Sequence, residues 1–298
     1  MKKKNIAITV CLATVVACLA GCAGKAPEKE DVYQANLTET LLQKYDTVSN
    51  TTKIYIDGDY GYEIDSAVKE NYLYTYFDRQ GEYEYSETDI AGRVIRLCSK
   101  DGGGVAKQIV DCDSAFFEEN VMKDYTVFSF GYVENEHIES STKNGDLTTM
   151  VTSMDKETAE EVSGSNLPDM NDGDKLIDEY TMDTETLELR SISTYVLRKD
   201  GTKQMYMETT FAYNQSFPEA PAEYQAAFSG ADTRVLTFKI DAGTEEEEIL
   251  TSTVSVGVPV QFHLPEGYAM YSDAECTQAY EFDMNEQDDV TLYLVKEM

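Results

Sequence analysis

The chain contains no tryptophan and only two histidines, His137 and His263, and it has far fewer basic than acidic residues. Its 24 lysines and arginines stand against 56 aspartates and glutamates, which gives a formal net charge of −32. Such a surface repels nucleic acid and anionic lipid headgroups, and the sequence has no basic stripe. Serine-hydrolase, HExxH and CxxC motifs are also missing, so we expect no enzyme, no cofactor and no metal site.

The first 22 residues have the anatomy of a secretory signal. Three lysines precede an apolar run from Ile6 to Ala20, and small residues then lead to Cys22. The run is shorter than the roughly 20 apolar residues that a membrane-spanning helix needs. The stretch Leu19-Ala20-Gly21-Cys22 resembles the lipobox of bacterial lipoproteins, which implies cleavage before Cys22 and a lipid on its sulfur. The alternative is an ordinary signal peptide with an incidental cysteine.

Loss of residues 1–21 takes away three lysines and no acids, so the net charge moves from −32 to −35. Residues 22–34 then form a charged, lipidated tether. Buried acyl chains contribute roughly 0.8 kcal/mol per methylene, enough for two or three chains to hold a domain at a membrane. We therefore expect an exported protein anchored to the outer face of the bacterial cytoplasmic membrane, or a periplasmic or outer-membrane protein if the envelope has two membranes.

Three cysteines remain beyond the tether, namely Cys98, Cys112 and Cys276. Cys98 and Cys112 lie on two strand-like runs on either side of a glycine-rich turn. If the hairpin centres near Val105, the two sulfurs face each other within disulfide reach. Two free, partly buried thiols are the alternative, because export alone does not guarantee oxidation.

Hydrophobic periodicity changes along the chain. Leu37, Leu41, Tyr45 and Val48 have helical spacing, and Asn36 with Glu39 resembles a capping box, so one amphipathic helix is expected over 36–48. Period-two alternation then predicts half-buried antiparallel strands. One strand has Tyr72, Tyr74 and Tyr76 on one face, the next has Tyr83 and Tyr85, and a later one has Thr126, Phe128, Phe130 and Tyr132. Residues 113–124 and 153–164 break this rhythm and predict short helices.

The clearest hairpin surrounds Asp200-Gly201, a strong two-residue turn signal. A two-residue loop would pair Lys199 with Thr202 and Val196 with Met205. One face would then carry five apolar side chains, and either the opening helix covers that face or it lines a cavity. The candidate lining residues are Ile192, Val196, Met205, Met207 and Phe211.

The order of one helix, a long meander and small inserted helices over residues 35–230 resembles the lipoprotein carriers of the LolA and LppX type. The closing stretch "DEYTMDTETLELRSISTYVLRKDGTKQMYMETTFAYNQSFPEAP" has the cadence of that family's last strands. The resemblance implies an antiparallel half-barrel wrapped on helices, with an apolar cavity for acyl chains. Together with the C-terminal part, the expected fold class is mainly β with few helices.

A proline- and alanine-rich stretch, 216–234, predicts a boundary before a second domain at 231–298. Over 234–298, "GYAMYSDAECTQAYEF" followed by "DDVTLYLVK" resembles a diverged internalin B-repeat, also called the Listeria–Bacteroides repeat. The usual Gly-Trp of that repeat is missing. The resemblance implies a small C-terminal β-grasp-like domain that acts as a spacer or interaction module on a bacterial surface.

Two hypotheses follow. In the first, the protein is a non-enzymatic, membrane-anchored envelope lipoprotein whose half-barrel binds an apolar ligand, such as a lipid or another lipoprotein's acyl chain. In the second, it is a surface interaction or adhesion lipoprotein with a solid core, whose partner is another protein. Neither hypothesis involves nucleic acid.

Native mass spectrometry of the protein, purified from cells with its lipidated tether removed, tests the first hypothesis. An apolar cavity predicts a bound lipid mass and uptake of a fluorescent fatty acid, because water fills such a groove poorly. A clean unliganded mass without fatty-acid uptake would contradict it.

Overall fold

The computed structural model describes residues 27–79, 82–100, 105–126, 136–163, 168–215, 217 and 219–297. The predicted signal segment 1–21 and the predicted lipidation site Cys22 lie outside these residues. Within the described ranges, no helix has both the length and the apolar character needed to cross a membrane.

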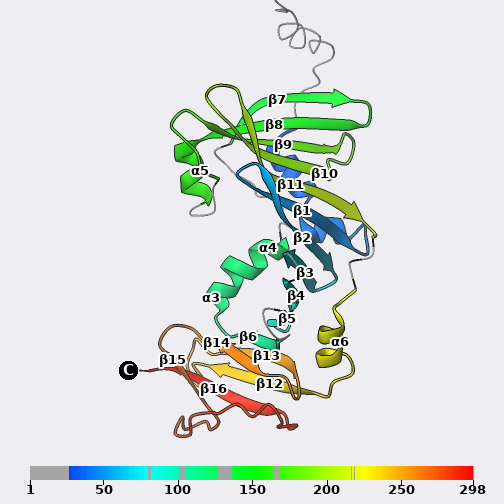
Figure 1. Cartoon of the computed structure of the whole chain (residues 1–298). Coiled ribbons are helices and arrows are strands. Elements are labelled where there is room, and N and C mark those ends of the chain that lie inside the picture. The colour runs from blue at the N-terminus through cyan, green and yellow to red at the C-terminus, as the bar shows by residue number, and fades with distance from the viewer. Residues whose placement is uncertain are drawn as a thin grey trace, which may run out of the picture.

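In the described part of the chain, twelve strands form one open, mainly antiparallel sheet and four strands form a smaller sheet, as Figure 1 shows. This confirms the predicted fold class. The order across the large sheet is β14 (Val260–His263), β6 (Val105–Asp111), β5 (Val94–Ser99), β4 (Glu82–Asp89), β3 (Tyr72–Arg79), β2 (Asp59–Lys69), β1 (Val48–Ile56), β11 (Lys203–Tyr213), β10 (Leu189–Leu197), β9 (Lys175–Asp183), β8 (Leu147–Asp155) and β7 (His137–Asn144).

Two meanders build this sheet, and a single strand pair joins them. Strands β1 to β6 follow one another as antiparallel neighbours, and so do β7 to β11. The return strand β11 lies beside β1, with Val48 opposite Tyr213 and Ile54 opposite Met207. We call the β1–β11 pair the seam, because it brings the first and last strands of the half-barrel together.

Short helices cover one face of the sheet, here called the inner face. Val32 of α1 (Lys29–Ala35) packs with Ile192 and Phe211, and Leu41 of α2 (Thr38–Leu42) packs with Val48. The predicted helices at 113–124 and 153–164 are confirmed as two further groups. They are α3 (Ser114–Phe117), the π-helix η1 (Glu118–Met122) and α4 (Lys123–Thr126), and then α5 (Lys156–Ser163).

The prediction of one opening helix over 36–48 was wrong. Asn36 ends α1 and does not cap a longer helix, because its side chain is used elsewhere. Its amide nitrogen donates to the carbonyls of Val32 and Leu187, at 2.7 and 2.9 Å, and its amide oxygen accepts from the Leu189 N–H at 3.0 Å. Val48 already belongs to β1. Helix α1 also occupies residues 29–35, which the sequence placed largely in the tether.

The predicted strand at 126–132 is not supported at Thr126, the part of it that the structure describes, because Thr126 ends α4. Phe128, Phe130 and Tyr132 lie outside the described residues.

The β10–β11 hairpin forms as predicted, but its loop is longer and its register shifts once. Leu197 pairs with Lys203, and the Asp200 carboxylate accepts from the Thr202 N–H at 2.9 Å. A bulge after Thr194 places Val196 opposite Gln204 and not opposite Met205. The predicted partners of Thr194 and Ile192, namely Met207 and Thr209, are correct.

The proposed disulfide is contradicted, because Cys98 and Cys112 are both free and buried. Ser99 pairs with Val105, so the β5–β6 hairpin turns earlier than Val105 and Cys98 lies opposite Ala106. Cys112 is six residues further along the strand direction, about 20 Å at 3.3 Å per residue. Cys98 packs beside Tyr85, whereas Cys112 joins a different cluster near the C-terminal sheet.

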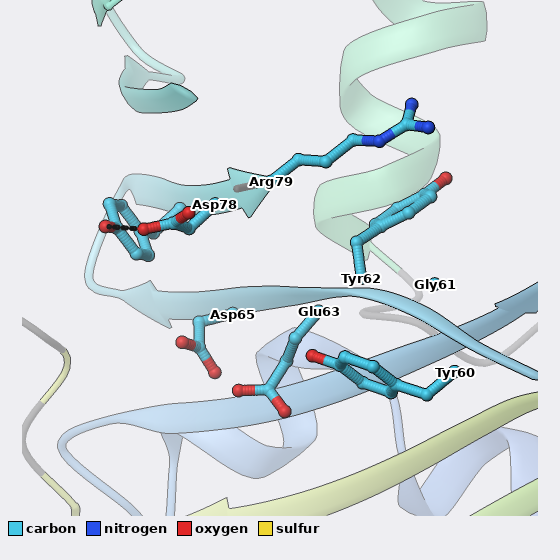
Figure 2. A pocket seen from close by; sticks show the side chains of 8 residues that line it. Tyr60, Gly61, Tyr62, Glu63, Asp65, Asp78 and Arg79 are labelled. Carbon is cyan, nitrogen blue, oxygen red and sulfur yellow. Dashed lines mark hydrogen bonds between the residues drawn. The ribbon is translucent and has the colours of Figure 1, made fainter. Parts of the chain in front are cut away.

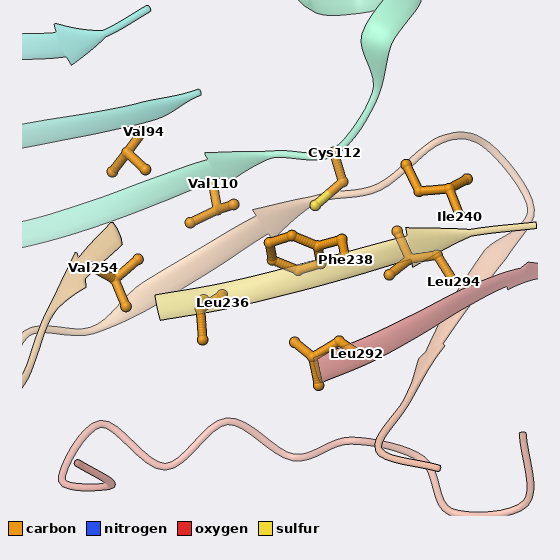
Figure 3. Packing of buried hydrophobic residues seen from close by; sticks show 9 residues of the cluster. All are labelled: Val94, Val110, Cys112, Leu236, Phe238, Ile240, Val254, Leu292 and Leu294. Carbon is orange, nitrogen blue, oxygen red and sulfur yellow. The ribbon is translucent and has the colours of Figure 1, made fainter. Parts of the chain in front are cut away.

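The smaller sheet has the order β13 (Glu248–Ser255), β12 (Thr233–Ile240), β16 (Val290–Lys296) and β15 (Tyr268–Tyr271), with β12 and β16 parallel. It lies against the β5–β6 end of the large sheet, and Figure 3 shows Val94, Val110 and Cys112 meeting Leu236 and Phe238. The intervening strand β14 pairs with β6. The C-terminal segment therefore contributes to both sheets.

One glutamine links the two sheets through its side chain. Gln108 is fully buried, accepts from the Ser255 N–H at 2.7 Å and donates to the Ser255 carbonyl at 3.0 Å. A buried polar group that loses its partner costs about 1 to 3 kcal/mol. Gln108 thus holds the end of β13 against β6.

We predict that Gln108→Leu lowers the free energy of unfolding by about 1 to 3 kcal/mol, because it leaves the Ser255 amide and carbonyl unpaired. Denaturant unfolding measures the loss, and hydrogen exchange should show faster exchange in β13 and β14. The matched control is Gln261→Leu at the exposed position of β14, expected within about 0.5 kcal/mol of wild type. Equal stability of the two variants would contradict the prediction.

Candidate functional site

Three adjoining pockets form a groove on the outer face of the sheet, opposite the α1 and α2 helices. The groove crosses β11, β1, β2 and β3, so it lies on the seam. The first and second pockets share Glu63 and Asp65, and the second and third share Gln215 and Phe217. Their volumes are about 510, 530 and 250 Å³ in that order.

Small and polar side chains make the floor of the middle pocket. Thr51 of β1 lies opposite Thr210 of β11 on one side and Asp65 of β2 on the other. Its hydroxyl donates to the Asp65 carboxylate at 2.5 Å. Because alternate residues of a strand share a face, Ser49 and Ala212 extend the same shallow floor.

The first pocket is acidic and aromatic. Figure 2 shows Glu63 and Asp65 leaving β2 on one side, and Tyr62 leaving it on the other. The hydroxyl of Tyr76 donates to Asp78 at 3.3 Å, and Tyr60 is 60% exposed. The lining comprises Tyr60, Gly61, Tyr62, Glu63, Asp65, Tyr76, Asp78 and Arg79.

Gly61 lies where β2 enters the pocket, and a larger residue would fit only tightly there. The register of β1 and β2 shifts between Ile54 and Tyr55, and Tyr55 pairs with Tyr60 beyond the shift. A Cβ at position 61 would lie 3.0 Å from the Ile56 side chain and 3.1 Å from the Ile54 carbonyl oxygen. The register shift between β1 and β2 lets Tyr60 contact Tyr55, with ring centroids 6.3 Å apart.

Negative charge exceeds positive charge at this end of the groove. Among the described residues, Lys53 lies directly opposite Glu63 in the strand register. The Arg79 guanidinium instead stacks over the Tyr62 ring, 6.0 Å from its centroid. Burial raises the pKa of the Tyr76 hydroxyl, and the Asp78 charge raises it further, so that hydroxyl stays neutral and donates.

The third pocket is aromatic. The Phe217 ring lies 5.7 Å from the Tyr74 ring and 6.3 Å from the Tyr85 ring. Tyr224 of α6 (Ala222–Phe228) packs on Tyr85 at 4.6 Å and closes the outer face beyond it. Burial raises the pKa of Tyr74 to about 12. Thr47, Ala67, Lys69 and Gln215 complete the lining.

Three of the five predicted cavity residues, Ile192, Val196 and Phe211, pack on the opposite, inner face. Ile192 and Phe211 pack with Val32 of α1, and Val196 packs with Ala159 of α5. Phe211 also reaches the wall of the middle pocket. Met205 and Met207 are half-buried on β11. The opening helix thus covers part of this face, which was one of the two sequence-based alternatives; lining of an apolar cavity by the five residues stays a prediction.

A buried carboxyl pair lies beneath the start of α1. The carboxyl groups of Glu136 and Asp178 share a hydrogen bond, Tyr180 donates to Glu136 at 3.0 Å and Thr194 donates to Asp178 at 2.5 Å. The Lys29 ammonium donates to the Glu136 carbonyl oxygen and is 3.9 Å from its carboxylate. Burial raises the pKa of Glu136 to about 7 and also raises that of Asp178.

Neither histidine forms a catalytic arrangement within the described residues. His263 lies 3.1 Å from the buried Asp111 carboxylate and packs on the Phe116 ring, while the nearby Ser114 hydroxyl donates to Glu248. His137 is at the start of β7, in the other meander. The described part of the chain also contains no cluster of three acids, histidines or cysteines suited to a metal ion.

The sequence predicted that Tyr72, Tyr74 and Tyr76 share one face of a strand, but it did not predict a groove on that face. Tyr74 and Tyr76 do share a face, as the alternation predicted. The run of Ser49, Thr51 and Lys53 on the same face was the available signal, since a strand with a small polar face leaves room above it. Only the seam register shows that Thr210 and Ala212 continue that face.

Comparisons with known proteins give little. No protein-family model matches the chain, and no curated protein matches it. Among solved structures, PNGF-II is similar at 8% identity with a TM-score of 0.27, and the match covers 62% of this chain but only 30% of that one. MucB bound to the periplasmic part of MucA is similar at 12% identity with a TM-score of 0.26, covering 82% of this chain and 68% of that one. The Pseudomonas aeruginosa MucA/MucB complex gives 10% identity, a TM-score of 0.27, and coverage of 82% and 69%. Scores this low carry no argument about fold or function.

The carboxyl pair predicts a pH effect on stability. Because the folded pKa of Glu136 is raised, the native state keeps a proton that the unfolded chain loses, and stability falls as pH rises from about 4.5 to about 7. Going from pH 5 to pH 8, Glu136→Gln should gain on the order of 1 to 3 kcal/mol relative to wild type. Denaturant unfolding at both pH values measures this difference.

The control for that experiment is Glu139→Gln on β7. Lys175 donates to this exposed carboxylate at 2.7 Å, and that hydrogen bond, with one from Ser153, lowers its pKa. Glu139→Gln should therefore gain no stability relative to wild type over the same pH range. A Glu136→Gln curve parallel to that of wild type would contradict the assignment.

Proposed function

We propose that the protein is a membrane-tethered, non-enzymatic binding protein of the cell envelope that holds its ligand in the outer-face groove on the seam. The observation that carries this proposal is the contrast between the two faces of the large sheet. Helices α1 and α5 pack on the inner face at Ile192, Phe211 and Val196, whereas the outer face is hollowed along β11, β1, β2 and β3.

The tether and the architecture support this function. The lipobox-like sequence before Cys22 provides a membrane anchor, and the lack of catalytic motifs favours binding over chemistry. The floor of the groove lies on paired strands, which hold its side chains in position without a ligand, and Gln215 and Phe217 of the loop after β11 complete its wall. The C-terminal sheet and α6 cover the outer face over β3 to β6 and leave the seam open.

Storage of an apolar ligand on the inner face is the less favoured function. An acyl chain bound along Ile192 and Phe211 would have to displace Val32, which is fully buried against them. That displacement exposes apolar surface at a cost of roughly 25 cal/mol per Å². The groove needs no such rearrangement before it accepts a ligand.

Selection from a displayed library of random seven-residue peptides tests the groove. We predict that peptides selected on the wild-type protein lose at least about tenfold in affinity for Thr51→Trp, because the indole fills the middle pocket. Biolayer interferometry measures the affinities. The matched control is Glu245→Trp, which places the same side chain on an exposed loop. Selected peptides that bind Thr51→Trp unchanged would contradict the proposal.

A further inference from the structure

We propose that the ligand of the groove is an extended basic segment of a protein. Its lysine or arginine would occupy the acidic first pocket, and an aromatic or large aliphatic side chain four residues away would occupy the aromatic third pocket. This inference rests on the proposed function, because it names the ligand class of the same site.

The charge distribution selects a cation for the first pocket. Glu63 and Asp65 project to the same side of β2, and Asp78 lies beside them on β3. The Arg79 guanidinium lies over Tyr62 on the other side of β2, and Lys53 is the described cation opposite Glu63, so three carboxylates face one ammonium. A ligand cation would balance part of this excess, and the chain's net charge of −32 would attract it from a distance.

Tyrosine rings add a second reason for a cation. Tyr60 is largely exposed at the rim, and the Tyr76 ring lies beside the Asp78 carboxylate. A lysine or arginine over such a ring gains cation–π attraction in addition to the ion pair. The same geometry occurs on the other side of β2, where the Arg79 guanidinium lies over the Tyr62 ring.

The third pocket has the opposite preference. Rings of Tyr74, Tyr85 and Phe217 line it, and among its described lining residues Lys69 carries a charge and none is a carboxylate. A ligand cation would be repelled there, whereas an apolar ring would bury its surface against three others. The groove therefore has a direction, with a cation at one end and an apolar group at the other.

The spacing of the two ends fits an extended chain. From Glu63 to Ala67, β2 advances four residues, about 13 Å at 3.3 Å per residue. In an extended ligand, side chains four residues apart cover the same distance and project to the same side. Side chains five apart project to opposite sides, so they would not enter both pockets together.

Four fluorescent peptides with blocked ends test the inference by anisotropy with the full chain in nonionic detergent. They are Lys-Ser-Thr-Ser-Phe, the same peptide with Gln or with Glu in place of Lys, and the five-residue spacing Lys-Ser-Thr-Ser-Thr-Phe. We expect the first to bind about tenfold more tightly than the Gln peptide, and more tightly than the other two. Its affinity should fall as salt rises from 50 to 300 mM.

Paired variants assign the effect to the pocket. Glu63→Gln with Asp65→Asn should abolish the preference for lysine, because it removes two carboxylates while keeping side-chain shape. Glu245→Gln with Glu246→Gln removes the same charge from an exposed loop and should keep the preference. A Gln or Glu peptide that binds as tightly as the Lys peptide, or a lysine preference that survives the first pair, would overturn the inference.

Thr51→Trp separates this inference from the proposed function. If all four peptides bind equally and all lose affinity for Thr51→Trp, the groove is the binding site and the basic ligand class is wrong. If the Lys peptide binds Thr51→Trp as tightly as wild type, the groove is not the site and both proposals fail.

Discussion

The pairing of β1 with β11 is the interaction on which the rest of the structure depends. It joins the first strand of one meander to the last strand of the other, with Val48 opposite Tyr213 and Ile54 opposite Met207. Without it there would be two smaller sheets, each with an exposed edge. With it, the inner-face side chains of both meanders form one surface for α1 and α2, and the outer-face side chains form one floor for the groove.

The two faces of this sheet differ because of what packs on them. On the inner face, apolar side chains from β1, β10 and β11 meet short helices that are fixed by polar anchors, such as the Asn36 side chain on Leu187 and Leu189. On the outer face near the seam, serine, threonine and alanine are too small to fill the space between the flanking tyrosines. The groove therefore arises from the small size of these strand side chains.

The C-terminal sheet limits the groove without touching its acidic end. Strand β14 extends β6, the cluster around Phe238 seals the β5–β6 end, and α6 brings Tyr224 onto Tyr85. These contacts supply the aromatic wall at one end of the groove and leave Glu63 and Asp65 open at the other. The charge gradient along the groove thus follows from how the chain returns to its own sheet.

The sequence by itself determined the mainly β class, the short helices at 113–124 and 153–164, and the shared faces of the tyrosine strands, because these depend on local periodicity. The sequence also determined the excess of acidic over basic side chains. Only the tertiary structure decided the split of the opening helix at Asn36, the bulge after Thr194 and the separation of Cys98 from Cys112. Each depends on a partner distant in sequence or on the exact register of a strand pair, which periodicity alone does not fix. The groove is of the same kind, because Thr210 joins Thr51 and Asp65 only when β11 returns to lie beside β1.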